Sequence, residues 1–134
     1  MALPINILII CAKNEEQAEF AEIVQLAGMR SICCAYLQEA RNILSRQDIH
    51  AVITGENLPD GSYQDVIHQR GRDSEELPVI VFSNSCDWDQ YLRMMRSGAF
   101  DSIVYPPDST EVARILRQAI RRAKERSGMA VTAA

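Results

Sequence analysis

AVITGENLPDG, residues 51–61, is a short apolar run followed by a polar loop. The apolar part, residues 52–54, is typical of a strand buried on both faces of a parallel sheet. The loop favours a turn, because Pro59 fixes its own φ and because Asp60 and Gly61 tolerate turn conformations. A buried strand that ends in such a loop fits a domain in which strands and helices alternate.

Strand-like and helix-like segments alternate on both sides of this stretch. Further apolar runs of strand length lie at 5–11, 31–35, 78–82 and 102–105. The segments between the strands repeat apolar residues three and four apart, which predicts helices at 14–27, 37–47, 63–67, 88–97 and 109–126. Asn14 and Gln17 are spaced as a capping box at the start of the first helix. Five alternations with short connections predict an α/β domain with a parallel sheet.

Size and charge limit the possible classes of protein. The chain has 134 residues, of which 47% are hydrophobic. This fits one domain, residues 1–126, followed by residues 127–134 as a flexible tail or the start of a linker. A net charge of −4 predicts neither nucleic-acid nor membrane binding, and no apolar run approaches the roughly 20 residues that span a bilayer. Four cysteines without CxxC spacing favour reduced thiols in a cytoplasmic protein over disulfides or a metal site.

Ligands of an open α/β sheet bind at the carboxyl ends of the strands. The residues expected there are Cys11, Ala12, the segment 55–61, Ser83, Tyr105 and Pro106. A nucleotide or flavin site would need a phosphate-binding loop rich in glycine, serine or threonine after the first strand. Residues 11–14, Cys-Ala-Lys-Asn, do not form one, so no cofactor is expected.

The strand and loop at 51–61 resemble the third strand and following loop of a response-regulator receiver domain. The resemblance covers roughly residues 5–126. It implies a CheY-like, flavodoxin-like (βα)5 fold with a doubly wound parallel sheet in the order 2-1-3-4-5. In working receivers of two-component systems, an aspartate in the pocket at the strand ends accepts a phosphoryl group during a phosphorelay.

The residues that match this pocket lack its chemistry. The two acidic Mg²⁺ ligands of the family match Cys11 and Ala12, and the phosphoryl acceptor matches Gly55. The carbonyl that completes the metal site falls on Asn57, and the hydroxyl that contacts the phosphoryl group is kept as Ser83. Magnesium needs oxygen ligands, so no metal is expected.

The fifth strand differs from the family in the same way. The lysine that usually precedes a proline there matches Tyr105, and the aromatic switch residue matches Ser102. The family implies a cis bond between Tyr105 and Pro106. The tyrosine ring is expected either to fill part of the vacated crevice, with its hydroxyl at the rim, or to point outward.

The sequence leaves two alternatives to a degenerate phosphorylation pocket. In the first, Glu56 or Asp60 replaces the acceptor, although a one-residue step along a strand should turn Glu56 to the other face, and Asp60 should shape a turn. In the second, Cys11 acts as a redox or small-molecule sensor, but a buried, inert thiol is the favoured interpretation. No catalytic residue and no enzymatic activity are therefore predicted.

The predicted function is that of a pseudo-receiver, a protein–protein interaction module of signal transduction that works without phosphorylation. In receivers, the fourth helix, fifth strand and fifth helix commonly form the partner or dimer surface. Here that surface would carry Trp88, Tyr91, Ser102, Arg117 and Arg121. Trp88 and Tyr91 also begin the apolar side expected for the fourth helix, with Leu92 and Met95. The expected partner is a signalling protein, an output domain or a second copy of the chain.

Overall fold

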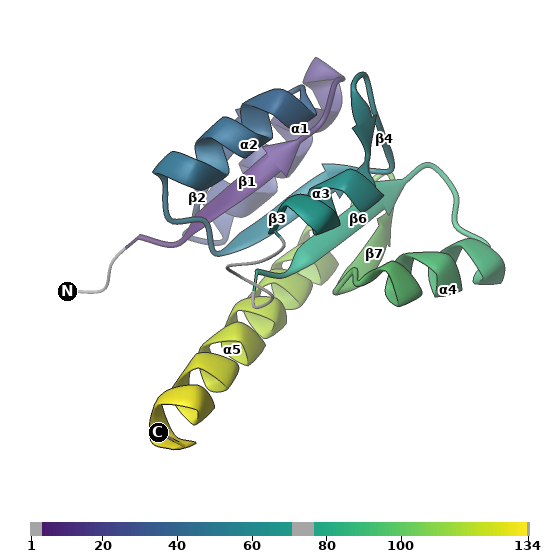
Figure 1. The fold of residues 1–134 in the computed structure, drawn as a ribbon. Helices are drawn as coiled ribbons and strands as arrows, with labels where there is room; N and C mark the ends of the chain where they lie inside the picture. Colours follow the sequence, from purple (N-terminus) through teal and green to yellow (C-terminus); the bar gives the residue numbers. More distant parts are fainter. Residues whose placement is uncertain (1–3, 71–76, 134) are drawn as a thin grey trace.

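Five parallel strands form the central sheet of the computed structural model, which describes residues 4–70 and 77–133 (Figure 1). They are β1 (Asn6–Ile10), β2 (Arg30–Cys34), β3 (Ala51–Gly55), β6 (Val79–Ser83) and β7 (Asp101–Val104). Their spatial order is β2-β1-β3-β6-β7. Counted along the sheet strands alone, this is 2-1-3-4-5, so the predicted topology is confirmed. A hairpin of two short strands, β4 (Asn57–Leu58) and β5 (Gly61–Ser62), lies in the loop after β3 and was not predicted.

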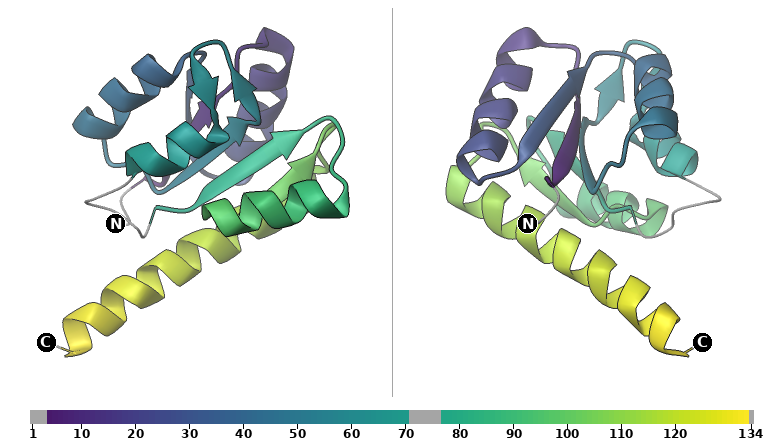
Figure 2. Two further views of the ribbon diagram at one scale, coloured as in Figure 1. Left: turned by 45° about the vertical axis from the view of Figure 1, so that its right-hand side comes forward. Right: turned by 90° about the vertical axis from the view of Figure 1, so that its left-hand side faces the viewer.

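Helices cover both faces of the sheet (Figure 2). They are α1 (Asn14–Leu26), α2 (Leu37–Arg46), α3 (Tyr63–Arg70), α4 (Trp88–Ser97) and α5 (Ser109–Ala133). α1 and α5 pack on one face, and α2, α3 and α4 pack on the other. This two-sided cover explains the continuous apolar strands: Ile7 and Ile9 face α1 and α5, whereas Leu8 and Ile10 face the opposite layer.

The first turn of α1 differs from the predicted capping box. Its N-cap residue is Lys13, and no side chain caps the helix. The Gln17 amide instead donates hydrogen bonds to the carbonyl oxygens of Cys11 and Cys34. Gln17 thus joins the ends of β1 and β2 beneath the carboxyl edge of the sheet.

The buried side of α4 also differs from the prediction. Met94 is its buried residue, whereas Trp88 is 69% exposed and Tyr91, Leu92 and Met95 are partly buried. Asp87 caps the helix, because its side-chain carboxylate accepts a hydrogen bond from the backbone amide of Gln90 at 2.8 Å. Trp88 is therefore at the first turn of the helix, where its ring faces solvent instead of the sheet.

The helix α5 projects beyond the edge of the sheet (Figures 1 and 2). It continues to Ala133, through most of the segment predicted as a flexible tail or linker, and Ala134 lies outside the described residues. Residues 113–126, rich in alanine, arginine, lysine and glutamate, are good helix formers, whereas residues 127–134 contain only methionine and three alanines of that kind, so the last turns continue a helix that the preceding residues favour. The end of the domain at residue 126 stays a prediction.

Candidate functional site

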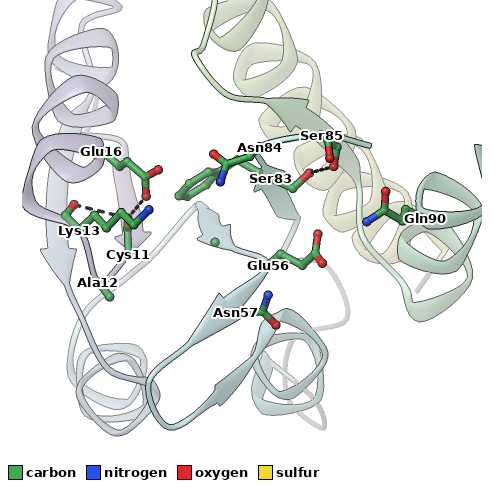
Figure 3. Close-up of a pocket in the computed structure, with 12 residues that line it drawn as sticks. Cys11, Ala12, Lys13, Glu16, Glu56, Asn57, Ser83, Asn84, Ser85 and Gln90 are labelled. Atoms are coloured by element: carbon green, nitrogen blue, oxygen red, sulfur yellow. Dashed lines mark hydrogen bonds between the residues drawn. The ribbon is translucent and has the colours of Figure 1, made fainter. Parts of the chain in front are cut away.

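A cavity of about 360 Å³ opens at the carboxyl ends of β1, β3 and β6 (Figure 3). The loops after these strands and the first turns of α1 and α4 supply its walls. The lining residues are Cys11, Ala12, Lys13, Glu16, Gly55, Glu56, Asn57, Phe82, Ser83, Asn84, Ser85 and Gln90. Five of the seven predicted pocket residues are among them. Tyr105 and Pro106 are not.

The Cys11 thiol is buried at the end of β1. It is 2% exposed, and its Sγ donates to a carboxylate oxygen of Glu16 at 3.2 Å and to the Lys13 carbonyl at 3.6 Å. Burial is the main cause that raises the pKa of the Cys11 thiol to about 11. The thiol is therefore protonated at neutral pH. These surroundings match a structural cysteine and give no support to a reactive thiolate.

The ring of Phe82 lies over Gly55, the residue that the resemblance matches to the acceptor. A Cβ built on Gly55 would lie 3.5 Å from the Phe82 Cζ atom and 3.6 Å from the Asn57 carbonyl oxygen. Phe82 packs in turn on Phe20, with 4.7 Å between ring centroids. The sequence places Phe82 in a strand but does not indicate that its ring forms a wall of the crevice.

Glu56 lines the cavity, so the prediction that it faces away is wrong. The regular ladder of β3 ends at Gly55, and the chain bends there. The Glu56 amide donates to the Phe82 carbonyl at 3.0 Å, and its carbonyl accepts from the Tyr63 amide at 3.1 Å. Beyond the strand the side chains no longer alternate between faces, and Figure 3 shows the Glu56 carboxylate between Ser83 and Asn57.

Asp60 lies outside the cavity and caps α2. Its two carboxylate oxygens accept hydrogen bonds from the amides of Leu37 at 2.7 Å and Gln38 at 3.1 Å. The bond from Leu37 is the main cause that lowers the pKa of the Asp60 carboxyl. A Cβ on the neighbouring Gly61 would lie 2.7 Å from Asp65 Oδ2 and 2.9 Å from Leu37 Cδ2, so both side-chain ends would have to shift to admit one. This loop is fastened to α2 and α3.

Replacing Asp60 by alanine should lower the thermal midpoint of unfolding, because two amides at the start of α2 lose their acceptor. The folded pKa of Asp60 lies below the unfolded value of about 3.9, so its contribution is complete above that pH and is lost as pH falls through the folded pKa. Thermal unfolding followed by circular dichroism should therefore separate wild type from Asp60→Ala at about pH 7 and much less at about pH 2. Asp60→Asn, which keeps an oxygen acceptor, should lose less than Asp60→Ala. Equal midpoints at neutral pH would contradict the capping role.

Tyr105 packs beside the cavity, and neither predicted alternative describes it. Its hydroxyl donates a short hydrogen bond to a carboxylate oxygen of Glu19. This bond is the main cause that raises the pKa of the Tyr105 phenol to about 12. The ring centroid is 6.4 Å from those of both Phe20 and Phe82, so the ring extends their aromatic cluster. The bond to Pro106 is cis, as predicted.

Comparisons with known proteins agree with this geometry. No protein-family model matches the chain. Response regulator protein PilR of Pseudomonas aeruginosa is 27% identical over 85 residues, which are 63% of this chain and 19% of PilR. A response regulator receiver domain protein from Clostridium thermocellum has a TM-score of 0.81 at 21% identity, over 90% of this chain and 97% of that one. The fold is that of receiver domains. The beryllofluoride-activated NtrC4 receiver domain dimer shares it, with a TM-score of 0.81 at 16% identity over 88% and 98% of the two chains.

In this receiver-domain fold, the hydroxyl of Ser83 already has a partner. Its Oγ donates to the Ser85 carbonyl at 2.9 Å. Ser102, which the resemblance matches to the aromatic switch, is half-buried in β7, and its backbone amide donates to the Asp101 carboxylate at 2.8 Å. Ser83 thus has a hydroxyl bound within its own loop, and Ser102 has no ring.

The predicted partner surface of the receiver fold presents exposed aromatic and basic groups. The rings of Trp88 and Tyr91 stack with 5.7 Å between centroids and 13° between planes. Val104, on the edge strand β7, is 51% exposed. Arg117 and Arg121 are exposed on α5. None of these residues lines the cavity, although Gln90 of the same helix, α4, does.

Two further searches concern the described part of the chain only. Residues 4–70 and 77–133 contain no group of three or more histidine, cysteine, aspartate or glutamate side chains placed to hold a metal ion. Within the same residues, no helix is both long enough and apolar enough to cross a membrane.

Proposed function

We propose that this domain is a pseudo-receiver of a two-component response regulator, which binds a protein partner without being phosphorylated and without catalysing a reaction. The crevice at the strand ends carries the proposal. It has the place and walls of a phosphorylation pocket, but Cys11, Ala12 and Gly55 offer no side-chain oxygen to a metal ion or a phosphoryl group. The cytoplasmic location stays a prediction.

The remaining acids of the crevice do not replace the missing set. Glu16 accepts the hydrogen bond of the Cys11 thiol, and Glu56 comes from the loop after β3. A hard cation such as Mg²⁺ takes six oxygen ligands in near-octahedral geometry and binds through carboxylates and phosphate oxygens. The free carboxylate of Glu56 and the Asn57 carbonyl supply too few oxygen ligands for such an ion.

A phosphoaccepting receiver that uses Glu56 is the second candidate function. The observation in its favour is that Glu56 lines the cavity. Asp60, the other acid considered, is less suitable because both its oxygens accept hydrogen bonds from α2 and it lies outside the cavity. Glu56 alone remains as a possible acceptor.

Acetyl phosphate and Mg²⁺ separate the two functions. We expect the intact mass to stay unchanged after incubation, because the crevice has no acceptor with a metal beside it. Amide chemical shifts around Cys11, Gly55 and Ser83 should also stay flat as Mg²⁺ is added. A phosphoryl adduct that forms in the wild type and disappears in Glu56→Gln would establish the second candidate instead. Glu111→Gln, a matched change in α5 outside the cavity, serves as the control.

The proposed partner surface consists of α4, β7 and α5. The exposed Trp88, stacked on the partly buried Tyr91, supplies an aromatic anchor of the kind that dominates protein interfaces. A ligand shifts a conformational equilibrium only if it contacts the two states differently. With no phosphoryl group to meet Ser83 and no ring at Ser102, this surface has one state, and binding of a signalling protein, an output domain or a second copy is constitutive.

A further inference from the structure

The exposed side of α1 is acidic and ends in an uncovered leucine. Glu15 and Glu22 are exposed and lie two turns apart, on the side of the helix opposite the buried Phe20. Leu26 follows one turn after Glu22 and is 79% exposed. No lysine or arginine occurs within this helix. A large apolar side chain at such exposure, beside a row of like charges, suggests a surface that is covered when the domain is assembled.

The exposed side of α5 is basic and lies next to α1. Arg114, Arg117 and Arg121 are exposed on the side opposite the buried Leu116. Both helices pack on the same face of the sheet and contact one another. Within the described residues, Glu15, Glu22 and these three arginines form no hydrogen bond or ion pair through their side chains. Two complementary rows of charge thus lie side by side without pairing within the molecule.

The two rows are in register. Each helix begins at the carboxyl edge of the sheet and runs back along it. Glu22 and Arg117 both lie eight residues after the first residue of their helices, and Leu26 and Arg121 both lie twelve residues after it. At a rise of about 1.5 Å per residue, the two members of each pair lie at similar distances along their helices from the carboxyl edge of the sheet.

We propose that α1 and α5 together form an interface with a second copy of this chain. A twofold axis that bisects the angle between the two helices (Figure 2) places α1 of each copy against α5 of the other, which gives a closed, isologous dimer. Glu22 then meets Arg117 of the partner subunit, twice per dimer. The aliphatic stem of Arg121 of the partner subunit covers Leu26, as arginine stems do on apolar surfaces. This interface excludes Trp88 and Tyr91 but shares α5, with Arg117 and Arg121, with the proposed partner surface, and it goes beyond the proposed function, which does not require it.

Sedimentation velocity of the full chain over a range of concentrations tests the proposal. We expect a dimer at about 0.05 M salt that weakens at about 0.5 M, because exposed charges are screened. Glu22→Lys should weaken the dimer about tenfold or more, since attraction becomes repulsion at two symmetric contacts. The combined Glu22→Lys and Arg117→Glu variant restores the opposite charges and should return to within about threefold of the wild type.

Three controls make the result specific to this interface. Asp48→Lys makes the same charge change at an exposed residue between α2 and β3 and should leave the dimer intact. Trp88→Ala separates this dimer from one formed through α4, the surface proposed to bind a partner, and a dimer through α1 and α5 should survive it. Circular dichroism shows whether each variant is folded. A chain that stays monomeric at about 1 mM overturns the proposal. So does a dimer that Trp88→Ala breaks and Glu22→Lys does not, because its interface would then lie on α4.

Discussion

Replacing Phe82 by alanine should lower the free energy of unfolding by about 3–5 kcal/mol. The side chain is 4% exposed and packs on Phe20, so its removal leaves a cavity between β6 and α1 in addition to the lost burial. Urea unfolding followed by circular dichroism gives the change. The exposed Trp88 is a poor reporter, since its ring faces solvent in the folded state.

Phe82→Leu is the matched control, because it keeps a branched apolar side chain in the same strand and should cost less than alanine. If Phe82→Ala cost under about 1 kcal/mol, the ring would not be packed as described. The crevice should become larger in Phe82→Ala without gaining affinity for Mg²⁺. Removing an apolar wall adds no oxygen ligand.

Restoring the carboxylates should bring back metal binding and phosphorylation, but the acceptor alone should not. Gly55→Asp has room for its Cβ, which would lie in ordinary contact with Phe82. Without carboxylates at positions 11 and 12, no metal is held beside it, so acetyl phosphate should leave the mass unchanged. Cys11→Asp and Ala12→Asp added to Gly55→Asp should give both a phosphoryl adduct and a thermal midpoint that rises with Mg²⁺.

The thermal midpoint should depend on Mg²⁺ because Cys11 is buried beside Glu16. The Glu16 carboxylate repels an aspartate at position 11 unless a cation neutralises the two charges. The same variant with Gly55→Asn in place of Gly55→Asp keeps the shape but lacks the nucleophile and should bind no phosphoryl group. An adduct on the single Gly55→Asp variant would mean that Glu16 and Glu56 already hold the metal. The proposed absence of a metal site would then be wrong.

The sheet could be predicted from the sequence because each strand, buried on both faces, is a nearly continuous apolar run such as residues 6–10. The place of the crevice followed as well. Parallel strands end at one edge, so Cys11, Gly55 and Ser83 had to meet there.

Residues at the ends of elements could not be placed in the same way. Glu56 was assigned to the wrong face, because the sequence does not show at which residue the ladder stops. Asp60 contacts the amide of Leu37, which is 23 positions away in the sequence, and a local turn signal carries no information on such a contact. The apolar ring of Trp88 favours burial, but its exposure depends on where α4 begins relative to the sheet. The sequence does not show this.

The contacts of Asp60 and Gly61 change what the loop sequence can be used for. One residue holds the start of α2 and the other allows close approach of Asp65 and Leu37, and neither lines the crevice. Both contacts stabilise the connection between β3 and the helices, and both are needed whether or not an acceptor precedes the loop. A Leu-Pro-Asp-Gly run in another sequence is therefore a marker of how a third strand connects to its neighbouring helices. It gives no information on whether that domain can carry a phosphoryl group.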